Sequence, residues 1–133
     1  MTVVFRDAEQ IVGEHVRTAL ATVDVYSKVP AARTPADTFV LIRRVGGVAR
    51  NVVTDEATLA VEAWAPTKPE AHDLIQTVRA LIHEMPTTGP TATPVYRVTE
   101  FAGPAYLPDP DSTHDRLTFT VSVALRGADS VTL

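Results

Sequence analysis

Four histidines are the side chains best suited to metal chemistry in this sequence, and their spacing does not favour a metal site. His15 and His72 lie in different predicted helices, and His83 follows His72 at about 16 Å along the same helix. Two ligands that far apart cannot share one ion. His114 precedes Asp115 in a predicted turn, and no His-Glu-x-x-His pattern occurs. We therefore predict no catalytic metal and expect histidines on the surface.

Nucleophilic catalysis needs an activated serine, threonine or cysteine beside a base. The chain has no cysteine, which also excludes disulfides and thiolate zinc sites. None of its serines lies in a Gly-x-Ser-x-Gly elbow. Ser112 lies near His114, but both fall in a predicted loop with little to hold them rigid. We predict no catalytic residues.

The glycine pair Gly46-Gly47 is the remaining motif with a chemical role to consider. It lacks the spacing of a dinucleotide-binding or Walker loop, and it joins two predicted strands instead of a strand and a helix. A plain hairpin turn is favoured, and no cofactor is predicted.

Three arginines around this glycine pair are typical of a contact surface. Arg43, Arg44 and Arg50 flank the glycines, so a turn there would place three guanidinium groups at a hairpin tip. Guanidinium groups suit bidentate contact with carboxylates or phosphates. The alternative interpretation is a solvated hairpin end.

A second contact feature is the Pro-rich loop 102–115, which carries Tyr106, Leu107, Asp109 and Asp111. A loop of about 14 residues is long for a compact domain and usually carries function or disorder. An aromatic residue and a leucine on an acidic loop fit an arm that docks a partner, because prolines reduce the ordering cost of binding. The alternative is a mobile cover over a sheet edge.

The spacing of apolar residues predicts two amphipathic helices that position these features. Residues 7–23 place apolar side chains three and four apart, with acidic residues in the first turn. The second helix begins at a capping box, residues 67–70, and its apolar stripe runs to Met85. Pro86 and Gly89-Pro90 are expected to stop it.

Alternation of apolar and polar residues predicts five strands. They cover residues 38–45, 48–54, 58–65, 95–101 and 117–126, with turns at the glycine pair and at Asp55-Glu56. The last strand has five apolar residues at period two, so one of its faces is buried. The sequence therefore predicts an α+β fold in two layers, with a mainly antiparallel sheet of four to five strands packed against the two helices.

Composition supports one folded domain over residues 1–133. Hydrophobic residues make up 45% and charged residues 21%, which argues against disorder, and no apolar run is long enough for a membrane helix. Net charge is −4, without the basic excess typical of nucleic-acid binding. Charged residues follow the first five positions, unlike a secretory signal, so we expect a protein kept in a cytoplasm.

Three stretches carry a resemblance to a known family. They are Phe101–Asp109, Arg116–Val123 and Val61–Ala65, the last leading into the second amphipathic helix. In these stretches, and in the order and size of its elements, the chain resembles the tail terminator proteins of siphophages that infect actinobacteria. The family's motif does not define which residues face the neighbouring subunit.

The resemblance implies a structural virion protein, without catalytic residues or cofactors, that forms a hexameric ring. Such a ring caps the growing tail tube, ends its growth and joins the tail to the head connector, at the head-proximal end of a tail assembled in the host cytoplasm. Six subunits of net charge −4 would together carry −24, and a negative lumen lets DNA pass without specific binding. The three arginines could then pair with Asp109 and Asp111 of a neighbouring subunit.

Two other interpretations stay open. One is another neck or head-completion protein of a virion, which the genes next to this one would distinguish. The other is a small ligand-binding or enzymatic α+β protein, which a deep pocket with converging polar groups would distinguish.

Overall fold

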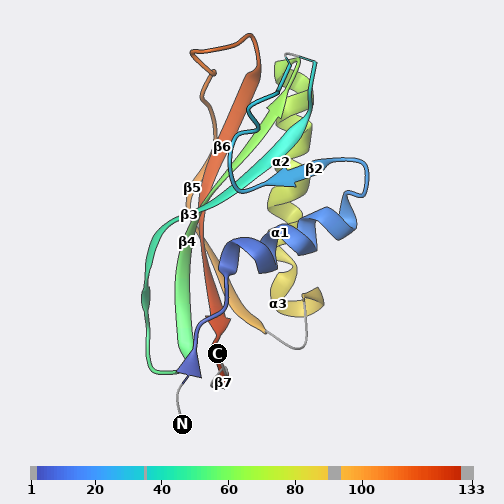
Figure 1. Cartoon of the computed structure of the whole chain (residues 1–133). Helices are drawn as coiled ribbons and strands as arrows, with labels where there is room; N and C mark the ends of the chain where they lie inside the picture. The colour runs from blue at the N-terminus through green and yellow to red at the C-terminus, as the bar shows by residue number, and fades with distance from the viewer. Residues whose placement is uncertain (1–2, 35, 90–93, 130–133) are drawn as a thin grey trace.

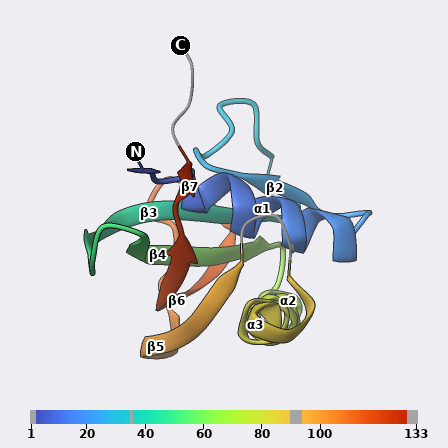
Figure 2. The same cartoon turned by 90° about the horizontal axis from the view of Figure 1, so that it is seen from below.

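The computed structural model describes residues 3–34, 36–89 and 94–129, which form a five-stranded sheet with two long helices on one face (Figure 1). In chain order the elements are β1 (Val3–Val4), α1 (Ala8–Ala19), β2 (Asp24–Tyr26), β3 (Phe39–Ala49), β4 (Thr54–Ala65), α2 (Lys68–His83), α3 (Met85–Thr88), β5 (Val95–Tyr106), β6 (Asp115–Arg126) and β7 (Ala128–Asp129). Figure 2 shows α2 end on and α1 lengthwise, so the two helices cross steeply over the same face. The α+β prediction is confirmed.

The large sheet has the strand order β2-β3-β4-β6-β5, and every neighbouring pair is antiparallel except β2 with β3. The prediction of a mainly antiparallel sheet is therefore confirmed. The sequence does not predict β2, because three residues are too few to show a periodicity. This strand pairs with β3 only along Phe39–Leu41, which leaves most of the β3 edge outside the β2 ladder.

Each helix begins behind a capping side chain. Thr67 is the predicted cap of the second helix, whereas Asp7, expected in the first turn of the first helix, is its cap instead. The Asp7 carboxylate accepts a hydrogen bond from the backbone N–H of Gln10, and the Thr67 hydroxyl accepts one from the backbone N–H of Glu70. The first helix ends at Ala19, before the predicted limit at residue 23.

The end of the second helix differs from the prediction. α2 ends at His83, and Pro86 lies in the first turn of the short helix α3 instead of terminating a helix. Proline is tolerated there because the first turn needs no intrahelical N–H donor. Gly89 ends α3, with its N–H bonded to the Met85 carbonyl, while Pro90 lies outside the described residues.

The core lies between the helices and the sheet. The predicted apolar face of β6 is entirely buried, and so are the alternate β4 residues predicted to share a face. These residues are Leu117, Phe119, Val121, Val123 and Leu125 in β6 and Leu59, Val61 and Ala63 in β4. Burial of this continuous apolar face against α1 and α2 supplies the main driving force for the fold.

The β3–β4 hairpin turns later in the sequence than predicted. β3 runs through Gly46-Gly47 to Ala49, and the chain reverses over residues 50–53. The predicted returning strand 48–54 and the predicted turn at Asp55-Glu56 are therefore both wrong.

The glycine pair lies at a bulge within β3. The register with β4 shifts between Arg44 and Gly46, and Gly47 adopts a φ of 113°. A Cβ built at Gly47 would lie 2.1 Å from the carbonyl oxygen of Glu56, across the ladder. Close approach of two backbones requires glycine here, whereas a Cβ at Gly46 would meet nothing within 4 Å.

We expect Gly47→Ala to lower the free energy of unfolding by at least about 1–3 kcal/mol, because the left-handed backbone alone costs that much for a residue with a Cβ. Gly46→Ala is the matched control and should have an effect within about 0.5 kcal/mol. Urea denaturation of the two variants measures the difference. Equal effects at both positions would contradict the assignment of the bulge.

Candidate functional site

The three arginines predicted at a hairpin tip are distributed along β3 and into its turn. Arg43 and Arg44 are neighbours within the strand, so their side chains point to opposite faces, and Arg50 begins the turn. Among the described residues, the three guanidinium groups do not gather at the hairpin end, and each pairs with a different carboxylate. The structure separates what the sequence analysis placed together.

Arg43 contacts a buried carboxylate on the face of the sheet away from the helices. Its Nη2 donates to Glu62 Oε2 at 3.1 Å, and half of the Arg43 side chain stays exposed. Trp64 Nε1 donates to the other oxygen of Glu62 at 3.1 Å, and Arg116 lies 3.6 Å from that oxygen. Two hydrogen-bond donors and a third positive charge around this carboxylate compensate its burial.

Arg44 forms a bidentate ion pair on the helix side of the sheet. Its two terminal nitrogens donate to both oxygens of the buried Asp55, at 2.6 and 2.9 Å. These hydrogen bonds to Asp55 raise the pKa of the Arg44 guanidinium. The backbone N–H of Arg44 donates to the Glu9 carboxylate of α1 at 2.6 Å, so Arg44 joins β3 to both β4 and α1.

Arg50 pairs with Glu56 across the hairpin, with Nε 2.6 Å from Oε2. The hydrogen bond from Arg50 is the largest influence on Glu56 and lowers the pKa of its carboxyl. More than half of the Arg50 side chain remains exposed. Arg43 and Arg50 therefore keep exposed surface, while Arg44 is used within the chain.

The predicted 14-residue loop is much shorter in the structure. β5 continues to Tyr106, so the connection covers only residues 107–114. The Tyr106 hydroxyl donates to Asp115 at 2.6 Å, and the ammonium group of Lys68 lies 4.3 Å from the centre of the Tyr106 ring. Tyr106 and Leu107 are 43% and 47% exposed, which fits a contact surface.

Asp109 is buried and ties this connection to the β2–β3 connection. It accepts hydrogen bonds from the Ser112 hydroxyl and the Asp111 backbone, and Arg33 from the β2–β3 connection lies 3.2 Å away. Asp111 itself is exposed. Of the two predicted acidic contacts, only Asp111 is placed to meet a partner directly.

His114 is also buried, so the expectation of surface histidines is wrong for this residue. Its Nε2 donates to the Asp37 carbonyl at 3.1 Å, and its ring stands edge-on to Phe39 and Trp64. Aromatic packing of this kind stabilises beyond area burial. The sequence contained no periodic signal for it, because the contacts join residues about 75 positions apart.

Ser112, His114 and Asp109 come together without the geometry of a catalytic triad. Ser112 Oγ lies 2.5 Å from Asp109 Oδ2 and 3.2 Å from His114 Nδ1. In a triad the histidine lies between serine and carboxylate and removes the serine proton. Here the serine lies between the other two residues and donates its hydrogen bond to the carboxylate, so the histidine is not placed to activate it as a nucleophile.

Acid should weaken the anchoring by Asp109. The Ser112 hydroxyl holds the pKa of the Asp109 carboxyl below its usual value, against the opposing effect of burial. A depressed pKa contributes stability above the unfolded pKa of about 3.9, and that stability is lost as pH falls through the lower folded value. We expect the stability difference between wild type and Asp109→Asn to be constant above about pH 5 and to shrink below about pH 4.

Chemical denaturation across this pH range measures the effect. Asp111→Asn is the control, since it removes an exposed neighbouring carboxylate. A wild-type minus Asp109→Asn difference that does not change with pH would show that the Asp109 charge does not stabilise the folded state.

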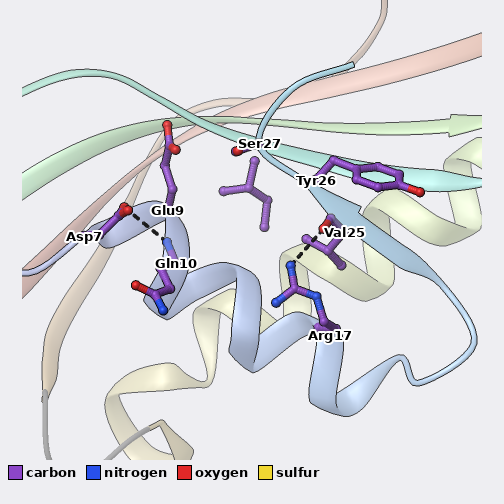
Figure 3. Close-up of a pocket in the computed structure, with 8 residues that line it drawn as sticks. Asp7, Glu9, Gln10, Arg17, Val25, Tyr26 and Ser27 are labelled. Carbon is purple, nitrogen blue, oxygen red and sulfur yellow. Dashed lines mark hydrogen bonds between the residues drawn. The ribbon is translucent and has the colours of Figure 1, made fainter. Parts of the chain in front are cut away.

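A cleft of about 250 Å³ lies between the start of α1 and strands β2 and β3 (Figure 3). It is lined by Asp7, Glu9, Gln10, Arg17, Val25, Tyr26, Ser27 and Ile42. Its charged groups already have partners in the chain: Asp7 caps α1, Glu9 accepts from Arg44, and Arg17 donates to the Val25 carbonyl at 2.8 Å. Asp7, Glu9 and Arg17 are therefore already engaged within the chain.

A second cavity, more apolar and open, lies at the end of the β3–β4 hairpin. It measures about 650 Å³ and is lined by Val3, Phe5, Ala49, Asn51, Val52 and Val53. Val45, Val48 and Val52 nearby along this hairpin are 55%, 66% and 80% exposed. The sequence analysis did not predict this apolar surface. The signal that could have indicated it is the uncharged run at residues 45–49.

The described ranges, residues 3–34, 36–89 and 94–129, also bear on metal binding and membrane crossing. No group of three His, Asp or Glu side chains there is placed to hold a metal ion. Nor is any helix in that part of the chain both long and apolar enough to cross a membrane.

Comparison with known proteins assigns the family. A search of curated proteins found no match to the chain. A family model described as phage tail termination protein matches residues 4–131, which include the helices α1, α2 and α3 and every strand of the large sheet. The match agrees with the resemblance carried by Phe101–Asp109 and Arg116–Val123 and indicates a structural role in a bacteriophage tail. The chain therefore belongs to the phage tail termination protein family.

Proposed function

We propose that this protein forms a closed ring, a hexamer, that caps the tail tube and ends its growth. The observation that carries the proposal is the family match over residues 4–131. In this function the whole chain acts as one domain, and its partners are further copies of itself, the tail tube protein and the head-tail connector. Head-to-tail contacts between identical subunits generate a ring when their rotation closes.

The proposed location is the head-proximal end of the virion tail, reached after assembly in the host cytoplasm. DNA passes through the ring without specific binding. A net charge of −4 per subunit supports this proposal, because phosphate contacts by basic residues are what hold DNA.

The exposed members of the predicted contact set are proposed to meet partners in the assembly. Arg43, Arg50, Tyr106, Leu107 and Asp111 present accessible side chains. Arg44 and Asp109 are proposed to support this surface from within, by fixing β3 and the β5–β6 connection. Charge reversal at Arg44 would bring two carboxylates together at Asp55, so it tests folding more than assembly.

The test is tube assembly in vitro. Tubes grown from the cognate tube protein should stop at a defined length and carry a ring at one end when this protein is added, as seen by negative-stain microscopy. Leu107→Asp should reduce capping, while Asp73→Asn, at a side chain 87% exposed on α2, should not. Tubes of unchanged length without terminal rings would contradict the proposal, and rings that bind only connectors would point to a neck protein.

A further inference from the structure

Two exposed apolar stretches lie toward opposite edges of the large sheet, in β3 and in β5. The first, Val45–Ala49 in β3, has every residue exposed, with Val48 at 66%. The second, Phe101–Ala105 in β5, has four of its five residues exposed, with Phe101 at 65%. Neither stretch contains a charged residue. We call them the valine stretch and the phenylalanine stretch.

The charges beside both stretches are neutralised within the subunit. Arg44 and Arg50, on either side of the valine stretch, pair with Asp55 and Glu56. Glu100, which precedes the phenylalanine stretch, accepts a bidentate pair of hydrogen bonds from Arg79 of α2. An uncharged partner surface can therefore cover either stretch without leaving one of these charges unpaired, which is the main penalty of burying ions.

The two stretches cannot cover each other in one subunit. β4 and β6 lie between β3 and β5, so roughly 14 Å of sheet separates them. Matching patches on opposite edges of one molecule favour a head-to-tail contact between copies. Both stretches are uncharged and the charges beside them are paired within the chain, so the two can cover each other between copies without burying an unpaired charge. We therefore take a second copy of this chain as the occupant.

Backbone irregularity at β5 favours contact through side chains. The register between β5 and β6 shifts between Glu100 and Ala102, which places Phe101 at a bulge. Pro104 has no N–H to offer to another strand. Phe101 is also exposed, and aromatic side chains contribute much of the energy of protein interfaces.

We infer that the valine stretch of one copy packs against the phenylalanine stretch of the next copy and forms the contact between subunits. This inference rests on the proposed ring and names the surface that closes it. Val48 and Phe101 are its central residues.

Site-directed crosslinking tests the contact directly, because the chain has no cysteine. Val48→Cys with Phe101→Cys should give a ladder of covalent oligomers with a short bismaleimide, on the free protein or on capped tubes. Val48→Cys with His72→Cys is the matched control, since His72 is exposed on α2 outside both stretches. We expect at least about tenfold more crosslinked product from the first pair.

Single charge insertions provide the second measurement. Val48→Lys and Phe101→Lys change exposed side chains, so circular dichroism should show folded monomers. Each should raise the concentration needed for assembly by about tenfold or more, since an unpaired charge would be buried. Light scattering after size-exclusion chromatography, and ring counts on tubes, measure assembly.

The outcomes separate the inference from the function it rests on. Rings that cap tubes normally in both lysine variants, with no excess of crosslinks between residues 48 and 101, would overturn this contact and leave the ring function intact. A wild-type protein that stays monomeric and leaves tubes uncapped would overturn both.

Discussion

Phe119→Ala is expected to lower the free energy of unfolding by about 3–5 kcal/mol, the usual cost of removing a buried phenylalanine. Phe119 is 1% exposed and lies in the middle of β6, opposite Val61 of β4. A loss of this size is a large share of the roughly 5–15 kcal/mol that stabilises an ordinary domain. Equilibrium denaturation by urea, followed by circular dichroism, measures it. The same reasoning predicts that Val121→Asp, a charge within the core, prevents folding.

Thr118→Ala is the matched control for Phe119→Ala. Thr118 is the preceding residue, so its side chain lies on the opposite face of the sheet and is only partly buried. Its replacement should cost less than about 1 kcal/mol. If Phe119→Ala left the midpoint unchanged while Thr118→Ala lowered it, the register of β6 would be wrong by one residue.

Trp64→Ala should have a similarly large effect, about 3–5 kcal/mol, because this side chain is 1% exposed and contacts Arg33 and His114 from two different connections. Its ring stacks on Phe39 with centroids 5.1 Å apart and meets the edge of His114 at 5.6 Å. The guanidinium group of Arg116 lies 4.9 Å from the ring centre. Without the indole, the β5–β6 connection should lose protection against amide exchange, measured by mass spectrometry on peptides covering residues 107–114.

Trp64→Phe separates packing from hydrogen bonding at this position. It keeps an aromatic ring beside Phe39 and His114 but removes the Nε1 donor to Glu62. We expect a smaller loss of stability, with near-normal exchange protection in the connection. Normal protection in Trp64→Ala as well would show that the loop is anchored independently of the indole, through Arg33, Asp109 and Ser112.

The β5–β6 connection illustrates how a local pattern misleads about burial. Prolines and aspartates predict an exposed loop, and Leu107 and Asp111 do lie at the surface. Asp109 and His114 have the same local character but are buried by Arg33, Asp37 and Phe39, far away in the sequence. Burial of a polar residue depends on a distant partner that a single stretch of sequence does not identify.

The arginines show the same limit for electrostatics. Their proximity in sequence predicts a joint cationic surface, but cross-strand register pairs each with a different carboxylate: Glu62, Asp55 and Glu56. That register follows from the position of the turn. Gly46-Gly47 suits both a hairpin turn and a bulge, and the backbone of β4 at Glu56 and Ala57 decides between them.

The two helices, the cap at Thr67 and the buried faces of β4 and β6 could be predicted from the sequence, because helix and strand periodicities and capping hydrogen bonds are local. The family could be predicted from the resemblance in Phe101–Asp109 and Arg116–Val123. Tertiary structure alone decided where β3 turns, that β2 joins the sheet, which charges are compensated and that Val48 and Phe101 stay exposed. A valine or phenylalanine has the same local preference in a core as on a surface. Only the arrangement of neighbouring elements determines whether water or protein covers it.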